Sequence, residues 1–140
     1  MTTEQNKAAV HRFHDAFNAG DLDGAVAVFA ANAVVHNSGA PDPLTMEGFK
    51  QLGAVFLSAF PGGTGIIEDI IVEGNKVVSR LTFRGTHTGD LMGIPPTGKT
   101  VTISEMIIDQ FADGKIVESW HLFDQMGMMQ QLGVIPTPEQ

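Results

Sequence analysis

The 140-residue chain has no cysteine and no tyrosine, and its aromatic side chains are nine phenylalanines and one tryptophan. Without cysteine there is no disulfide framework, no thiol nucleophile and no cysteine-based zinc site. No apolar run approaches the length of a membrane span, and the polar start from Met1 to Lys7 is not a signal peptide. These absences predict a soluble protein of the cytoplasm.

Basic residues are also scarce, because eight of them face sixteen acidic ones and the formal net charge is −8. Such a surface repels nucleic acid and anionic membranes, so a neutral or hydrophobic small molecule, or another protein, is the expected partner. The five histidines are scattered without a metal-binding spacing, and the glycines follow no nucleotide-binding pattern, so no metal or nucleotide site is predicted. The length indicates a single domain over residues 1–140, in which the tail 136–140 frays.

The first half of the chain predicts three amphipathic helices. Thr2 and Gln5 can form a capping box that starts the first helix, which ends at a glycine. Leu22–Ala30 is a shorter helix, and Thr45–Phe60 is a third with phenylalanines on one face. His14 lies near the apolar stripe of the first helix, where a structural or surface role is favoured over catalysis.

The second half predicts four strands and a helical turn. The strands are Gly65–Glu73, Lys76–Thr86, Thr100–Phe111 and Gly114–Asp124, and the helical turn is Gln125–Leu132. Tight turns join the strands, so they should pair mostly antiparallel. Helices followed by such strands indicate an α+β domain, in which three N-terminal helices pack on one face of a curved, mostly antiparallel sheet. A sheet that closes over helices makes a cone with an internal pocket.

Asp124 is the first candidate for catalysis, because it ends the last strand. In an unbroken strand Asp124 shares a face with Trp120, which places a carboxylate beside an indole. Burial there would move the carboxyl pKa towards the range of a group that both takes and gives a proton. Asp124 can equally cap the helical turn that follows, and the two roles do not exclude each other.

Several other polar residues can reach a pocket, depending on which face of the sheet they occupy. His36 ends a predicted strand, Ala33–Asn37, beside a flexible loop. Arg80 either points inward, where it needs an anionic partner, or faces solvent from the other side of its strand. In the next strand Glu105 and Asp109 share one face and Gln110 has the other, and a bulge would swap them.

The order of elements and the motifs of the second half resemble the SnoaL-like polyketide cyclases, or ester cyclases, of the nuclear transport factor two-like superfamily. The motifs are Gly85-Thr86-His87-Thr88-Gly89, Gly93-Ile94-Pro95-Pro96-Thr97-Gly98-Lys99, Asp113-Gly114-Lys115-Ile116-Val117-Glu118-Ser119-Trp120, Asp124 and Gln131-Leu132-Gly133. The resemblance covers nearly the whole chain. It implies the cone-shaped barrel and a homodimer packed through the sheet.

The resemblance also implies a cofactor-independent enzyme in which the residue matching Asp124 removes a proton from an activated carbon of a polyketide ester. The enolate closes a ring by an intramolecular aldol step, and the same acid returns the proton. The resemblance places five other residues at polar or aromatic pocket positions: His36, Asn37, Arg80, His87 and Trp120. Its members use His or Gln on the penultimate strand to polarise the substrate carbonyl, where Gln110 is the nearest candidate.

The chemistry requires a base of raised pKa and hydrogen-bond donors for the enolate oxygen. We therefore predict Asp124, His36 and Arg80 as catalytic residues. The predicted substrate-binding residues are Asn37, His87, Gln110, Trp120, Phe13, Phe17, Phe56 and Phe60.

Two alternatives stay open. Epoxide hydrolysis of the limonene type would use an Asp–Arg–Asp arrangement, which Arg80 and Asp124 could form with Asp109 or Glu105. A dimer that binds a small molecule without catalysis is the other. Ketosteroid isomerisation is disfavoured, because the tyrosine that it would use is missing.

Overall fold

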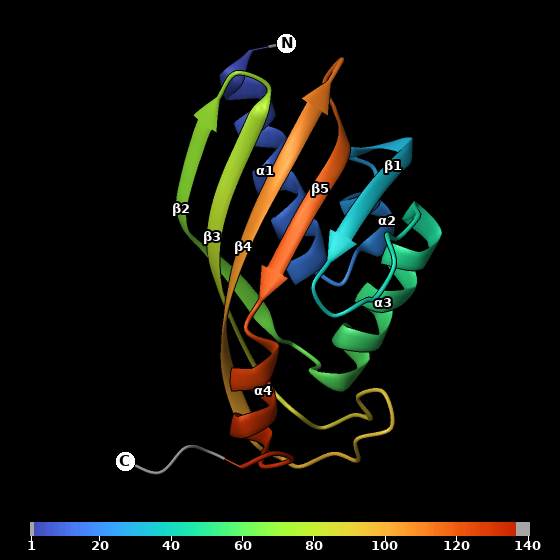
Figure 1. Cartoon of the computed structure of the whole chain (residues 1–140), viewed down its shortest axis with the longest axis vertical. Coiled ribbons are helices and arrows are strands. Elements are labelled where there is room, and N and C mark those ends of the chain that lie inside the picture. The colour runs from blue at the N-terminus through green and yellow to red at the C-terminus, as the bar shows by residue number, and fades with distance from the viewer. Residues whose placement is uncertain (1, 137–140) are drawn as a thin grey trace.

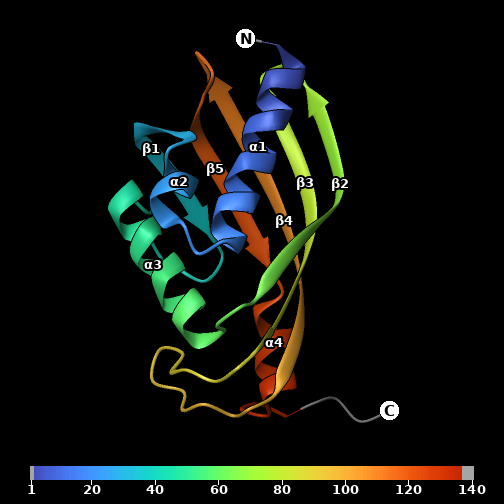
Figure 2. The same ribbon diagram turned by 180° about the vertical axis from the view of Figure 1, so that it is seen from behind.

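The computed structural model of the chain describes residues 2–136 and is shown from two opposite sides in Figures 1 and 2. Its elements are α1 (Thr3–Asn18), α2 (Leu22–Val26), β1 (Phe29–Asn37), α3 (Met46–Ala59), β2 (Thr64–Glu73), β3 (Lys76–Thr86), β4 (Thr100–Ala112), β5 (Lys115–Phe123) and α4 (Gln125–Leu132). The α+β class is confirmed. Residues 137–140 of the predicted frayed tail lie outside the described residues.

The five strands form one curved sheet in the order β1-β5-β4-β3-β2. Strands β2 to β5 pair antiparallel, and β1 pairs parallel with β5, so the sheet is mostly antiparallel as predicted. Helices α1, α2 and α3 cover one face of this sheet and leave the other uncovered (Figures 1 and 2). The sheet does not close into the predicted barrel, because β1 and β2 stand at its two edges.

Helix starts follow the local capping chemistry of the sequence. Thr2 and Gln5 form the predicted capping box at the start of α1, and the Thr45 hydroxyl accepts from the amide of Gly48 at the start of α3. Asp124 caps α4 by accepting from the amide of Gly127. Each side chain satisfies an amide that has no partner within its own helix.

The second helix is shorter than predicted, since it ends at Val26 instead of Ala30. Strand β1 begins at Phe29, which pairs with Ile116 of β5. The periodicity of the sequence extends through Ala30, but pairing with a strand almost ninety residues away decides the conformation there. Tertiary contacts of this kind override a weak local propensity.

Alternation along the strands separates a core-facing side from an outer side. On β5 the inward side chains are Ser119, His121 and Phe123, whereas Leu122 is 67% exposed. The β4–β5 register shifts between Gln110 and Phe111, so buried Ile116 does not share a face with Leu122. The sequence predicts that Trp120 and Asp124 share a face that points into a pocket. In the structure that face is the outer face of the sheet.

Helix α4 replaces β5 along the first part of β4, where β5 no longer reaches. The Gln131 side chain accepts from the amide of Thr102 at 2.7 Å and donates to its carbonyl at 2.8 Å. The Gln131 carboxamide thus forms the two hydrogen bonds with the backbone of Thr102 that a neighbouring strand would otherwise form. This contact holds α4 against the sheet, where Met128 and Leu132 join a hydrophobic cluster with residues from α3, β3 and β4.

Candidate active site

A cavity of about 220 Å³ lies between the inner face of the sheet and the helices. Its walls come from α1, α3, α4, all five strands and the loop between β3 and β4. From that loop Leu91, Met92 and Ile94 reach the cavity, and Leu91 and Ile94 exchange two backbone hydrogen bonds around a tight turn. Residues brought together from elements so far apart in sequence define a typical small-molecule pocket.

Most of the wall is aromatic or aliphatic. Six phenylalanines line the cavity: Phe13, Phe17, Phe49, Phe56, Phe83 and Phe123. Phe13 stacks on Phe49 with ring centroids 6.1 Å apart, and Phe56 meets Phe83 edge to face at 5.1 Å. Such walls suit a flat apolar ligand, because aromatic pairs favour stacked and edge-to-face contacts. The predicted wall positions Phe13, Phe17 and Phe56 are among them.

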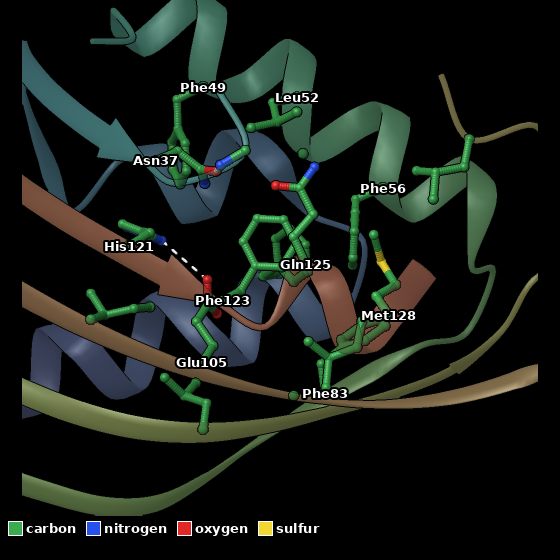
Figure 3. Close-up of a pocket in the computed structure, with 18 of the residues that line it drawn as sticks. Asn37, Phe49, Leu52, Phe56, Phe83, Glu105, His121, Phe123, Gln125 and Met128 are labelled. Atoms are coloured by element: carbon green, nitrogen blue, oxygen red, sulfur yellow. Dashed lines mark hydrogen bonds and ion pairs between the residues drawn. The ribbon is translucent and has the colours of Figure 1, made fainter. Parts of the chain in front are cut away.

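Inside this apolar wall the carboxylate of Glu105, from β4, faces the imidazole of His121, from β5. The His121 Nδ1 is 3.6 Å from the Glu105 Oε2, within ion-pair range but longer than a hydrogen bond (Figure 3). The side chain of His121 is 5% exposed and that of Glu105 is 25% exposed. The carboxylate is therefore the more accessible partner of the pair.

His14 of α1 lines the same cavity. Burial lowers its pKa from 6.5 to about 4, against the opposing effect of the Glu105 carboxylate, while His121 and His11 lower it further. The ring is therefore neutral near pH 7. Its Nε2 is buried and has no hydrogen-bond partner among the described residues.

Two side-chain amides bring further hydrogen-bonding groups to the cavity. Asn37, at the end of β1, accepts from the amide of Gly39 at 2.8 Å through its Oδ1, and its Nδ2 donates to no group among the described residues. The amide of Gln125 points towards the side where Asn37 lies (Figure 3). Asn37 is the predicted substrate-binding residue with the clearest donor in the cavity.

Asp124 is exposed and is not among the residues that line the cavity. Its Oδ1 accepts from the amide of Gly127 at 2.9 Å. The predicted capping role is thus confirmed, and the predicted role as a base stays a prediction. The carboxylate that the structure places in the cavity is Glu105.

Two other predicted catalytic residues lie on the outer face of the sheet. The His36 ring stacks on Trp120 with centroids 5.4 Å apart, and its Nε2 is 2.7 Å from the Glu118 carboxylate. Arg80 donates to the carboxylate of Asp69 and keeps 47% of its side chain exposed. Of the two possible orientations of Arg80, the solvent-facing one is observed, and the arrangement does not bring Arg80 to Asp124.

The remaining predicted substrate-binding residues have places outside the cavity lining. Gln110 is half-buried on the outer face beside Glu118. Phe60 is fully buried behind the wall, where it meets Phe56 and Phe83. His87 is also fully buried, and its Nδ1 accepts from the amide of Thr97 at 3.2 Å, which closes the base of the β3–β4 loop.

One further buried carboxyl lies on the inner face of β4. Asp109 is 4% exposed, and the Ser119 hydroxyl donates to its Oδ1 at 2.6 Å. Burial raises the pKa of Asp109, although the charge of His121 and the Ser119 hydrogen bond act in the opposite direction. Asp109 is not among the cavity-lining residues.

Within residues 2–136, no three histidine, aspartate or glutamate side chains gather as they would around a metal ion. In the same part of the chain, no helix is both long enough and apolar enough to span a membrane.

The polar centre of the cavity differs from the one that the sequence predicts. The sequence leaves the orientation of Glu105 open, does not single out His121, and favours a structural or surface role for His14. A signal exists for the first two, because Glu105, Ile107 and Asp109 alternate with more exposed residues, and Ser119, His121 and Phe123 alternate with the partly exposed Trp120 and the exposed Leu122. Knowing which face is inward requires the sheet register.

The fold and cavity define a class of small α+β proteins with an apolar ligand pocket and a few acid–base groups. The family model for "SnoaL-like polyketide cyclase" matches residues 7–132. The chain belongs to the SnoaL-like polyketide cyclase family and is a cyclase-like enzyme.

A curated relative and a solved structure are also cyclases by name, and a second solved structure with another assigned activity shares the fold. Aklanonic acid methyl ester cyclase DnrD of Streptomyces peucetius is 32% identical, over 93% of this chain and 92% of its own. The structure of IdmH from Streptomyces antibioticus, which is assigned as a polyketide cyclase, is 33% identical, with a TM-score of 0.82 over 92% of this chain and 99% of IdmH. AclR from Streptomyces galilaeus, assigned as a hydroxylase, is 27% identical with a TM-score of 0.90, over 99% of this chain and 87% of AclR.

Proposed function

We propose that the protein closes a ring in a polyketide ester by a cofactor-independent intramolecular aldol reaction, with Glu105 as the acid–base group. The observation that carries this proposal is the Glu105–His121 pair inside an aromatic cavity. Because the relatives include aklanonic acid methyl ester cyclases, aklanonic acid methyl ester is the substrate to test first.

The reaction needs a single proton to move out and back. The Glu105 carboxylate takes the proton from a carbon activated by neighbouring carbonyls, and the C–H electron pair becomes the enolate. The enolate carbon then bonds to a second carbonyl carbon of the same molecule. The new alkoxide takes the proton from Glu105, so the step consumes no oxidant, reductant or other co-reactant.

Within this scheme His121 acts as a positioning residue for Glu105. Its Nδ1 faces the carboxylate, and its ring is held edge to face by Phe49 with centroids 5.3 Å apart. An imidazole fixed in this way can orient the carboxylate and respond to its change of charge. Asn37 can donate to a substrate oxygen through the Nδ2 that its bond with Gly39 leaves free.

The test is turnover of aklanonic acid methyl ester by purified protein, followed by liquid chromatography with mass detection. Aldol closure leaves the mass unchanged, so the expected product has a new retention time at the mass of the substrate. Glu105→Gln keeps the shape and removes the base, and we expect a loss in kcat of about 10²–10⁴-fold. Asp124→Asn is the matched control and should keep activity.

The proposal fails if Glu105→Gln turns over at the wild-type rate while folded. Loss of activity in Asp124→Asn alone would restore the aspartate of the sequence prediction as the base. If neither wild type nor variants change the ester but the ester binds, the protein is a small-molecule-binding member of the family.

We also propose that the protein is a cytoplasmic enzyme and a homodimer, in which the two subunits pack through the outer face of the sheet. Apolar side chains on this face include Ile66 (58% exposed), Met106 (55%), Ile108 (40%) and Leu122 (67%). Met106 and Leu122 are partners in the β4–β5 register, and monomers rarely expose large contiguous apolar patches. Analytical ultracentrifugation should give twice the monomer mass, and Met106→Asp combined with Leu122→Asp should give the monomer; a wild-type monomer at micromolar concentration would contradict the proposal.

A further inference from the structure

Five buried polar side-chain atoms within residues 2–136 have no hydrogen-bond partner, and two of them belong to residues that line the cavity. These two are the Nε2 atoms of His14 and His121. An unpaired buried polar atom costs about 1–3 kcal/mol, so native proteins seldom keep one without a reason. Both residues line the cavity while the Nε2 atoms themselves are buried, so a turn of the ring brings such an atom to a ligand, which is its natural partner.

His14 differs from His121 in its chemistry. His121 faces the Glu105 carboxylate through Nδ1 at 3.6 Å. His14 takes part in no side-chain hydrogen bond or ion pair among the described residues, and its ring lies edge to face with Phe13 at 4.8 Å. Because burial holds its pKa at about 4, the ring carries one N–H donor and no charge at neutral pH.

The placement of His14 complements that of Glu105. His14 comes from α1, which covers the sheet, and Glu105 comes from β4 within the sheet, so a ligand between them is contacted from two sides. The two groups are near enough for the charge of Glu105 to affect the titration of His14. Neutral imidazole is suited to a carbonyl oxygen, since it donates a hydrogen bond and does not give up its proton to the enolate.

We propose that His14 is a further catalytic residue, whose neutral ring donates a hydrogen bond to the carbonyl oxygen of the carbon acid while Glu105 takes the proton. This inference rests on the proposed function for the identity of the base. As the C–H bond breaks, negative charge gathers on the carbonyl oxygen. His14 stabilises that charge and keeps its own proton, so the proton balance of the reaction is unchanged.

The first experiment measures the hydrogen bond without the reaction. The probe is 9-fluorenone, a flat aromatic ketone that has no hydrogen to lose beside its carbonyl. Its C=O stretching band in the infrared should move to lower wavenumber when it binds the wild-type protein. The shift should persist in His14→Gln, which retains an N–H donor, and disappear in His14→Phe, which fills the space with an apolar ring. The same band position in His14→Phe and wild type would overturn the inference.

The second experiment measures catalysis with aklanonic acid methyl ester. Loss of one such donor costs about 10²–10³-fold in kcat, so we expect this loss in His14→Phe with little change in KM and partial rescue in His14→Gln. Circular dichroism of each variant establishes that the fold is kept. Equal loss in both variants, with a normal fold, would indicate a packing role and overturn the inference.

The two experiments separate this inference from the proposed function. If the wild-type protein does not cyclise the ester but shifts the fluorenone band through His14, the cyclase proposal fails and the carbonyl-binding role stands. If the ester is cyclised and the band shift does not depend on His14, the cyclase proposal stands and His14 is not the donor.

Discussion

Replacing Asp124 separates its observed capping role from its predicted catalytic role. Asp124→Ala removes both the cap and the carboxylate, whereas Asp124→Asn removes the charge and keeps an amide oxygen that can accept from Gly127. Asparagine caps helices about as well as aspartate, while alanine costs typically about 1 kcal/mol. The structure therefore predicts that the two variants differ in stability and not in chemistry.

The expected size follows from the single hydrogen bond of 2.9 Å between Asp124 and Gly127. For a 140-residue domain the entropy of unfolding is about 0.3 kcal/mol per degree, so loss of ~1 kcal/mol lowers Tm by about 3 °C. Asp124→Asn should stay within about 1–2 °C of the wild type. Helix α4 also carries two cavity residues, Met128 and Met129, so Asp124→Ala should raise KM modestly.

The assay is thermal unfolding by calorimetry, combined with turnover of the ester, on all three proteins. Gly127→Ala provides an independent check, because its added methyl group would collide with the Asp124 carboxylate and disturb the cap while leaving the charge in place. A stable Asp124→Asn protein with kcat reduced a hundredfold or more would refute a purely capping role and make Asp124 the acid–base group.

Two further predictions concern the buried charges. Burial raises the pKa of Asp109, so the folded protein holds a proton that the unfolded chain releases above about pH 4, and stability falls as the pH rises through that window. Asp109→Asn keeps an acceptor for Ser119, so in urea unfolding the stability of this variant relative to wild type should rise between pH 4 and pH 7. If the difference in stability between the two proteins does not change with pH, burial does not raise the pKa of Asp109. The second prediction follows from Glu105: no lysine or arginine is among the described residues of the cavity wall. A free acid with its carboxylate ~8 Å from Glu105 should meet about 2 kcal/mol of repulsion at an effective dielectric constant of about 20. Calorimetric titration should then give the methyl ester an affinity roughly 30-fold above that of the acid. Equal affinities of the ester and the acid would contradict this prediction, and so would tighter binding of the acid by wild type than by Glu105→Gln.

The sequence alone determined most of the secondary structure, because the signals involved are local. The capping box of Thr2 and the bounds of β3 at Lys76 and Thr86 follow from neighbouring residues, and the structure has them as predicted. The helix predicted from Thr45 begins one residue later, at Met46, with Thr45 as its N-cap. The family also follows from local motifs. The predicted bounds of the second helix are wrong, because pairing with the distant strand β5 makes Phe29 the first residue of β1.

Only the tertiary structure decided which polar residues share the cavity. Side chains of a strand alternate between two faces, so one irregularity in pairing reverses the assignment of every residue beyond it. The register shift between β4 and β5 accompanies an inward His121 and an outward Trp120. Among the described residues, the Asp124 side chain makes only its capping bond. Glu105 and His121 are sixteen residues apart in the chain, and no local pattern records that they meet.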